Sequence, residues 1–156
     1  AMLDMRFRQM SHADWSAVLR SNLDTLFNST KQVVDGMADR GWGRIINIAS
    51  VAAEKGQIGQ INYATAKGAV IGFTRSLAQE VAARGVTVNL LSPGFIADDT
   101  ARPFPPALLD RIIESVPVGC LGTAQDLAGL CAWLASDEAA FVTGANYAIN
   151  GGVYMS

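Results

Sequence analysis

The run Arg44-Ile45-Ile46-Asn47-Ile48-Ala49-Ser50 decides the fold class of this chain. It is short and rich in isoleucine, which is typical of a parallel strand that is buried on both faces. Helical patterns cover residues 12–39 before it and 61–84 after it, and a second apolar run follows at residues 86–91. Alternation of helices with buried strands predicts an α/β fold with a parallel sheet.

Local signals mark where the helices begin and end. Ser11 and Asp14 resemble a capping box at the start of the first helix, and Gly41 stands just past its end. Gly85 ends the second long helix, and Thr123 caps a later helix that runs to about residue 135. The remaining expectations are a loop at residues 54–59, a loop or lid at 98–106, a short helix around 108–113 and a strand at 147–149. No linker interrupts this order, so residues 1–156 are predicted to form one domain.

The composition argues against several classes of function. The chain has 156 residues, half of them apolar, and a net charge of −2, so nothing attracts it to nucleic acid or to an anionic membrane. No apolar run approaches the ~18 residues of a membrane span. His12, Cys120 and Cys131 fit no zinc spacing, which predicts that no metal is bound. The two cysteines are interpreted as reduced thiols, which favours a cytoplasmic location.

Three polar side chains are predicted to meet at one edge of the sheet. Ser50 ends the first strand, where parallel sheets place ligands, and Tyr63 and Lys67 share a face at the start of the next helix. Hydride transfer to a ketone needs such a set, because the carbonyl oxygen must gain a proton. Tyrosine can donate it if an ammonium at about 4–6 Å lowers its pKa from about 10, and a serine hydroxyl can bind the oxyanion. The alternative is an exposed helical pair without a catalytic role.

Asn22 lies inside the apolar stripe of the first helix. A buried amide needs partners, so Asn22 is either bonded to backbone or holds a water that relays protons towards Lys67. A Ser-His-Asp hydrolase is disfavoured, because the chain has one histidine and no Gly-x-Ser-x-Gly elbow. The adjacent Asp98 and Asp99 are interpreted as solvated loop carboxylates rather than as an acid–base pair.

The motifs together resemble the short-chain dehydrogenase/reductase family. They match its pattern in order and spacing: Asn22, Ser50, Tyr63-x-x-x-Lys67 and Pro93-Gly94-Phe95-Ile96. The segments 41–48, 55–60 and 76–81 look like those of the bacterial acetoacetyl-CoA reductases and of the related 3-oxoacyl-acyl-carrier-protein reductases. The resemblance covers essentially the whole chain.

The resemblance implies reduction of a 3-oxoacyl thioester to its 3-hydroxyacyl form by NADPH, with NADH not excluded. Tyr63 would be the proton donor, Lys67 would lower the pKa of Tyr63 and bind the nicotinamide ribose, Ser50 would position the carbonyl, and Asn22 would serve a proton relay. The resemblance further implies that three residues lie against the nicotinamide: Pro93, Gly94 and Ile96. It implies that four residues line the acyl pocket: Gln57, Ile58, Gln60 and Phe95. The alternative is that Gln57 and Gln60 only belong to a solvated loop and bind no substrate.

The resemblance also implies a homo-oligomer, a dimer or a tetramer, that assembles through helices 12–39 and 61–84. The alternative is that the apolar faces of these helices only cover the sheet.

The length departs from the family pattern. Family members run to about 250 residues. The chain therefore corresponds to the C-terminal part of a doubly wound Rossmann fold and lacks its N-terminal mononucleotide-binding half. None of the 15 glycines forms the glycine-rich turn that holds a pyrophosphate, and the first strand is expected to leave an open hydrophobic edge. Asp98 stands where the family usually has a threonine near the cofactor.

Two interpretations follow from these departures. In the first, the chain is the catalytic part of a thioester reductase and is weak or inactive alone. In the second, it is a cofactor-free pseudoenzyme or an oligomerisation module.

Overall fold

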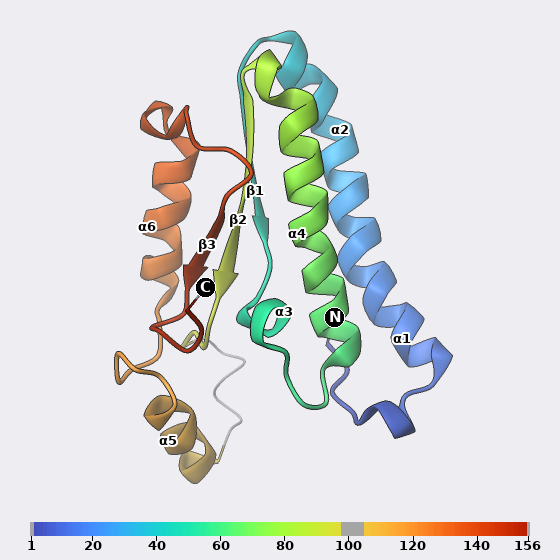
Figure 1. The fold of residues 1–156 in the computed structure, drawn as a ribbon, viewed down its shortest axis with the longest axis vertical. Coiled ribbons are helices and arrows are strands. Elements are labelled where there is room, and N and C mark those ends of the chain that lie inside the picture. Colours follow the sequence, from blue (N-terminus) through green and yellow to red (C-terminus); the bar gives the residue numbers. More distant parts are fainter. Residues whose placement is uncertain (1, 98–104, 156) are drawn as a thin grey trace.

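A three-stranded parallel sheet forms the centre of the molecule (Figure 1). The computed structural model describes residues 2–97 and 105–155. The strands are β1 (Gly43–Ile48), β2 (Val86–Pro93) and β3 (Asn146–Ile149), in the spatial order β1-β2-β3. The predicted α/β class with a parallel sheet is therefore confirmed. The strand predicted over 44–50 ends at Ile48, and the one predicted over 86–91 continues to Pro93.

The first helical rod contains an irregular turn that its periodicity does not reveal. It consists of α1 (His12–Leu19), a π-helical turn (Arg20–Asp24) and α2 (Thr25–Asp39). The second long helix, α4 (Ile61–Val81), passes into a single 3₁₀ turn at Ala82–Arg84. Later come α5 (Pro106–Glu114), α6 (Ala124–Ala135) and a 3₁₀ turn at Asp137–Ala139.

Two short elements complete the chain, and one of them corrects the sequence prediction. A 3₁₀ turn covers Phe7–Gln9, and α3 (Val51–Lys55) lies where residues 54 and 55 were expected to belong to a loop. This helix forms because the Ser50 hydroxyl accepts a hydrogen bond from the Ala52 N–H at 3.2 Å and so caps its first turn.

The predicted helix boundaries rest on side-chain caps and glycines that the structure contains. Ser11 and Asp14 form a reciprocal capping box, and Thr123 forms another at the start of α6. Gly85 has a φ of +72°, the left-handed region that glycine tolerates. A Cβ atom on Gly85 would also overlap the carbonyl oxygen of Gly41, so the turn into β2 requires glycine.

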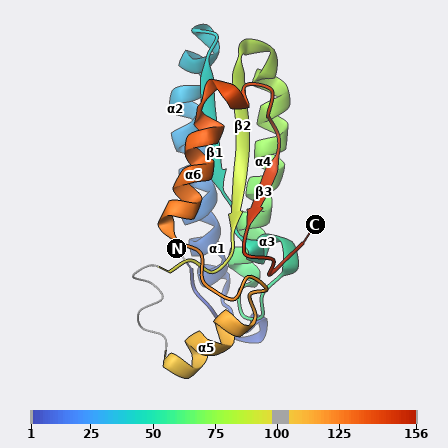
Figure 2. The same ribbon diagram turned by 90° about the vertical axis from the view of Figure 1, so that its left-hand side faces the viewer.

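Helices cover both faces of the sheet. Figures 1 and 2 show α2 and α4 on one face and α6 on the other. Among the described residues, one cluster of buried apolar side chains packs on the first face: Val34, Ile45, Ala78, Val81, Val86 and Val88. A smaller cluster packs on the second face: Leu91, Leu134 and Ala139. Strand β2 is buried on both faces because it is the central strand of the three.

The strand β1 forms an edge of the described sheet. Among the described residues it pairs with β2 alone, and Ile48 at its end is 46% exposed, which agrees with the expected open edge. None of the helices in residues 2–97 and 105–155 is long and apolar enough to cross a membrane. Asp98, Asp99 and most of the predicted lid lie outside the described residues.

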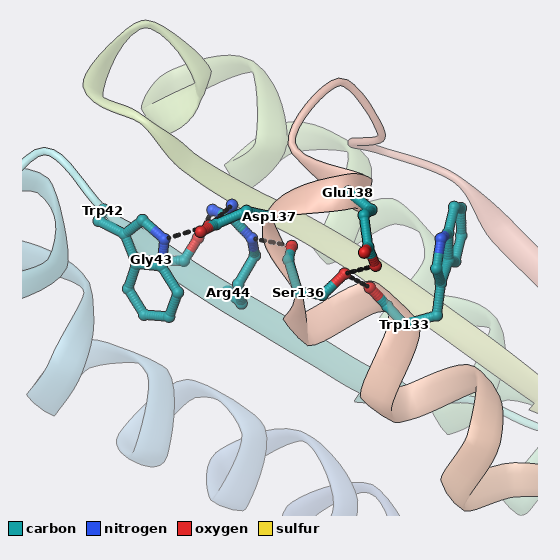
Figure 3. Close-up of polar contacts among 7 residues, drawn as sticks. All are labelled: Trp42, Gly43, Arg44, Trp133, Ser136, Asp137 and Glu138. Atoms are coloured by element: carbon teal, nitrogen blue, oxygen red, sulfur yellow. Dashed lines mark hydrogen bonds and ion pairs between the residues drawn. The ribbon is translucent and has the colours of Figure 1, made fainter.

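The amino end of the sheet is closed by a cluster of polar contacts (Figure 3). Arg44 donates through Nε to the Ser136 carbonyl at 3.2 Å and pairs with the Asp137 carboxylate at 3.3 Å. The Trp42 indole donates to the same carboxylate at 3.0 Å, and its ring centroid lies 4.9 Å from the Arg44 guanidinium carbon. These contacts join the start of β1 to the end of α6.

Candidate active site

The carboxyl end of the sheet holds a cleft of about 380 Å³. The end of β1 leads into α3, α4 begins beside it, and the segment after β2 passes along the other wall. Ser50 and Tyr63 both line this cleft, as the sequence predicted. The other lining residues come from the N-terminal segment, α3, the loop after it, the segment after β2, α5 and the segment before α6: Met2, Asp4, Val51, Ala52, Lys55, Gln57, Gln60, Gly94, Phe95, Ile96, Leu109, Ile112 and Leu121.

Ser50 and Tyr63 interact through their side chains. The Ser50 hydroxyl is close enough to the Tyr63 hydroxyl to favour the ionised form of Tyr63 and so to lower its pKa. Burial outweighs this effect, so the pKa of Tyr63 is raised above its usual value, and the negative charge of Asp4 adds to the rise. The direction is opposite to the expected lowering by Lys67. Tyr63 is therefore held in the protonated form, which is the form that can donate a proton.

Lys67 lies one turn after Tyr63 on the same face of α4. Its ammonium is 5.7 Å from the centroid of the Tyr63 ring and donates a hydrogen bond to the Ile48 carbonyl at 2.8 Å. Burial lowers the pKa of Lys67, because a low-polarity environment disfavours the charged form. The predicted convergence of the strand end with the Tyr63/Lys67 pair is thus present in the structure, with Lys67 tied to the last residue of β1.

Asn22 lies in the π-helical turn between α1 and α2. The residue is half-buried, and its amide donates to the Val18 carbonyl at 2.9 Å, which is one of the two interpretations left open by the sequence. The π turn packs against α4, the helix that carries Lys67. Such turns occur often at functional sites, and the proton relay through Asn22 stays a prediction.

The residues expected to line the acyl pocket separate into two groups. Gln57, Gln60 and Phe95 line the cleft, whereas Ile58 is 78% exposed and lies on a neighbouring groove. Gly94 and Ile96, expected beside a nicotinamide, line the cleft as well, and Pro93 is the last residue of β2 just before them.

Asp4 was missed by the sequence reasoning. Its carboxylate accepts a hydrogen bond from the Gln60 amide at 2.8 Å and forms part of the cleft wall. No local pattern could have identified it, because the contact joins residues 56 positions apart.

Asn62 was also missed, although it stands next to Tyr63. It is fully buried, its Oδ1 accepts from the Tyr63 backbone N–H at 2.8 Å, and its Nδ2 donates to the Leu3 carbonyl at 3.2 Å. This amide therefore ties the N-terminal segment to the first turn of the helix that carries Tyr63.

The polar groups of the cleft suit the nicotinamide end of a dinucleotide. The Tyr63 and Ser50 hydroxyls, which line the cleft, are donors for a carbonyl oxygen. The half-buried ammonium of Lys67, which is not among the lining residues, is a donor for ribose hydroxyls. The pyrophosphate end finds no glycine-rich turn in the sequence. Within residues 2–97 and 105–155 no group of three or more metal-ligating side chains is assembled.

Comparisons with known proteins find similar sequences and a similar fold. A family model described as enoyl-(acyl carrier protein) reductase matches residues 1–154. An acetoacetyl-CoA reductase of Cupriavidus necator is 56% identical over 152 residues, and a 3-oxoacyl-[acyl-carrier-protein] reductase of Pseudomonas aeruginosa is 47% identical over 148 residues. The crystal structure of the TT0495 protein from Thermus thermophilus is similar, with a TM-score of 0.91 and 34% identity.

The chain spans only part of the length of these proteins. The alignments cover 97% and 95% of this chain but 62% and 60% of the two relatives, and the structural match covers 98% of this chain and 66% of the other. The chain corresponds to a C-terminal portion of such a protein.

Proposed function

Because the chain belongs to the short-chain dehydrogenase/reductase family, we propose that it carries the catalytic residues for reducing a 3-oxoacyl thioester to the 3-hydroxyacyl form. The hydride donor in this proposal is a reduced nicotinamide, NADPH rather than NADH. The observation that carries the proposal is the Ser50–Tyr63 hydroxyl pair inside a cleft at the carboxyl end of the sheet. The names of two similar proteins, which act on acetoacetyl-CoA and on a 3-oxoacyl carrier protein, support the substrate class.

Each of the candidate catalytic residues has a separate role in the proposed reaction. The Ser50 hydroxyl donates a hydrogen bond to the substrate carbonyl, and Tyr63 donates its proton to the same oxygen as negative charge develops there. When bound, the nicotinamide supplies the hydride to the carbonyl carbon. Tyr63 regains its proton from solvent, for which Asn22 is the proposed relay residue. Lys67 would hold the nicotinamide ribose, and Pro93, Gly94 and Ile96 would hold the nicotinamide ring.

We also propose that turnover by the 156-residue chain alone is weak. A dinucleotide pyrophosphate normally binds at a glycine-rich turn, and no such turn occurs among the 15 glycines.

An oligomerisation module is the second candidate function. A groove between α2 and α4 has an apolar part, in which Phe27 is 57% exposed, and a polar and charged part: Phe27, Val34, Phe73, Leu77 and Val81, then Thr30, Lys31, Asp35, Ser76 and Glu80. Exposed apolar side chains with a polar and charged surround support assembly into a homodimer or homotetramer through these helices.

A turnover assay tests whether Tyr63 is the proton donor. The loss of reduced nicotinamide is followed with acetoacetyl-CoA, using NADPH against NADH, for the chain itself and for Tyr63→Phe. We expect slow turnover with NADPH that Tyr63→Phe lowers about a hundredfold or more. The control Tyr147→Phe, which removes the hydroxyl of a tyrosine that packs against Trp133, should retain the activity. Turnover that survives Tyr63→Phe would overturn the catalytic proposal. A folded chain with no turnover would mean that the catalytic residues are present without the part that binds the cofactor.

A further inference from the structure

Asn62 directly precedes Tyr63, and the function proposed above gives its side chain no role. The residue is fully buried, and both polar atoms of its amide are bonded to backbone. Its Oδ1 accepts from the Tyr63 N–H at 2.8 Å, and its Nδ2 donates to the Leu3 carbonyl at 3.2 Å. Loss of this amide would leave buried backbone groups without a partner, which is costly. The side chain therefore connects one point on α4 to one point in the N-terminal segment, residues 2–5.

The first turn of α4 depends on Asn62 for a cap. The residue at the start of the helix is Gln60, and its side chain makes no hydrogen bond to the helix. Its amide donates instead to the Asp4 carboxylate at 2.8 Å. The backbone N–H groups of a first helical turn have no partner within the helix, so they need acceptors from side chains or water. Asn62 supplies this acceptor to Tyr63 and so fixes the backbone of the residue that carries the phenol.

The same amide holds the N-terminal segment against the start of α4. The segment is also held by the Met5 N–H, which donates to the Gly59 carbonyl at 2.8 Å, and by the bond between Asp4 and Gln60. The bond to Asp4 is exposed, so water competes for both of its groups, whereas the bond from Asn62 is partly buried. Of these two side-chain bonds, the one from Asn62 should therefore contribute more to holding the segment in place.

The N-terminal segment forms the wall of the catalytic cleft beside Tyr63. Met2 and Asp4 line the same space as Tyr63. Burial raises the pKa of Tyr63, and the negative charge of Asp4 adds to the rise. The other charged groups near the phenol, within the described residues, are Lys55 and Lys67, which lie on α3 and α4. The position of the segment thus determines the Asp4 contribution and part of the burial.

We propose that Asn62 is a positioning residue for the reaction, which holds residues 2–5 as a wall of the cleft and fixes the backbone of Tyr63 beside that wall. This inference rests on the proposed function, in which Tyr63 is the proton donor. A wall in this place keeps the phenol shielded from water and next to a carboxylate, so Tyr63 stays protonated until the substrate oxygen takes the proton. Asn62 acts only through Tyr63 and the segment, and it does not line the cleft itself.

The first test is the titration of Tyr63 in Asn62→Ser. Serine is neutral, keeps an oxygen that can accept from the Tyr63 N–H, and is too short to reach the Leu3 carbonyl. Tyr63 should ionise at a lower pH in this variant, because the released segment takes Asp4 away and exposes the ring to water. Absorbance at the tyrosinate band measures the titration, with the curve of the same variant carrying Tyr63→Phe subtracted. An unchanged titration in a folded Asn62→Ser would overturn the proposal.

Asn89→Ser is the matched control. Asn89 is also buried, donates to the Val142 carbonyl at 2.8 Å and accepts from the Ala145 N–H at 3.1 Å, so it makes the same two kinds of bond. It lies on β2 and does not line the cleft. Its replacement should destabilise the fold but leave the titration of Tyr63 where it is in the original chain. An equal shift in Asn89→Ser would show a general loosening of the fold and would contradict a positioning role.

Hydrogen exchange followed by ¹H–¹⁵N NMR tests the segment itself. The Met5 amide should exchange roughly tenfold or more faster in Asn62→Ser, and much less so in Asn89→Ser. The original chain gives a measurement that needs no variant: the side-chain amide hydrogens of Asn62 should exchange roughly tenfold or more slowly than those of the exposed Asn28. Equal exchange of the two side chains would overturn the proposal even if Asn62→Ser does not fold.

A double variant shows whether Asn62 acts through the segment. Asp4→Asn alone and Asn62→Ser alone should each lower the pKa of Tyr63, and the double variant should lower it by less than the sum of the two shifts, because both remove the same charge from the phenol. Additive shifts would mean that Asn62 acts on Tyr63 without the segment, which contradicts the proposal.

These measurements need neither cofactor nor substrate, so they are independent of the turnover assay. Turnover that survives Tyr63→Phe would refute the proposed function and leave the contacts of Asn62 with the segment unaffected. Turnover that depends on Tyr63, together with a titration that Asn62→Ser leaves unchanged, would refute this inference alone.

Discussion

The two ends of the sheet use polar side chains in different ways. At the amino end, the Arg44 side chain is only 6% exposed, and hydrogen bonds and an ion pair join it to Ser136 and Asp137 (Figure 3). At the carboxyl end, Tyr63 and Lys67 are half-buried beside an open cleft, and the pKa of each is shifted towards its neutral form. The polar groups of the amino end are occupied by the protein itself, whereas the hydroxyls of the carboxyl end face space that a ligand can fill.

This difference shows how one small sheet can have stabilising polar contacts at one end and polar groups available to a ligand at the other. A desolvated hydroxyl or amine is costly, because burial disfavours its charged form. The amino end offsets such costs by joining β1 to α6 through the contacts of Arg44. The amino end should therefore respond to mutation mainly in stability, and the carboxyl end mainly in ligand binding and proton affinity.

The largest expected effect is at the amino end, at the glycine turn into β2. Gly85→Ala should lower the free energy of unfolding by about 3 kcal/mol, because alanine is strained at a φ of +72° and its Cβ would overlap the Gly41 carbonyl. Urea denaturation followed by circular dichroism measures the change. Gly36→Ala is the control, since a Cβ meets nothing within 4 Å there and alanine favours the helix. Equal stability of the two variants would contradict the tight turn.

The next largest effect is on the free energy of unfolding, and it is found by comparing variants of two arginines that both form ion pairs. Arg44→Gln should cost about 2 kcal/mol of unfolding free energy, because a buried guanidinium with several partners is lost. Arg84→Gln should cost about 0.5 kcal/mol or less, because the Arg84 side chain is 56% exposed in its pair with Asp39. Denaturation midpoints in urea test both. Equal costs would show that the contacts in Figure 3 do not hold the amino end together.

The sequence was sufficient where the signal is local. The isoleucine-rich run identified β1, and the caps at Ser11 and Thr123 marked two helix starts, because the side chains that make these structures lie within a few residues of one another. The pairing of Ser50 with Tyr63 was predictable for a related reason, since the carboxyl end of a strand and the start of the next helix meet at one edge of the sheet.

The features that were missed depend on contacts between distant residues. Helix α3 has only five residues, which are too few for a periodic pattern. Its Glu54 carboxylate accepts a hydrogen bond at 2.6 Å from the side-chain amide of Asn146, a residue near the other end of the chain. Asp4 reaches Gln60 across a long stretch of sequence. The sequence-based expectation for the pKa of Tyr63 considered the charge of Lys67 but not the burial of the ring, which only the packed structure determines, and its direction was therefore wrong.

The smallest expected effect is at the carboxyl end, on the proton affinity of Tyr63. Asp4→Asn keeps an oxygen that can accept from Gln60 but removes the charge, so the pKa of Tyr63 should fall, and only slightly, because the exposed carboxylate is already screened by water. Absorbance at the tyrosinate band measures the titration, and the curve of Tyr63→Phe is subtracted to remove the other two tyrosines. The shift should shrink with added salt.

The direction of the pH dependence follows from the same charges. The pKa of Tyr63 is raised in the folded state, so its contribution to stability is present below the unfolded value of about 10 and is lost as the pH rises through the folded value. The charged groups around the phenol in the described structure are Asp4, Lys55 and Lys67, and only Asp4 raises the pKa. Asp4→Asn should therefore let Tyr63 ionise at a lower pH, while Asp35→Asn, which changes a carboxylate on α2 away from the cleft, should leave the titration unchanged. An unchanged titration in Asp4→Asn would mean that burial alone sets the proton affinity of Tyr63 and that the N-terminal segment acts only as a wall.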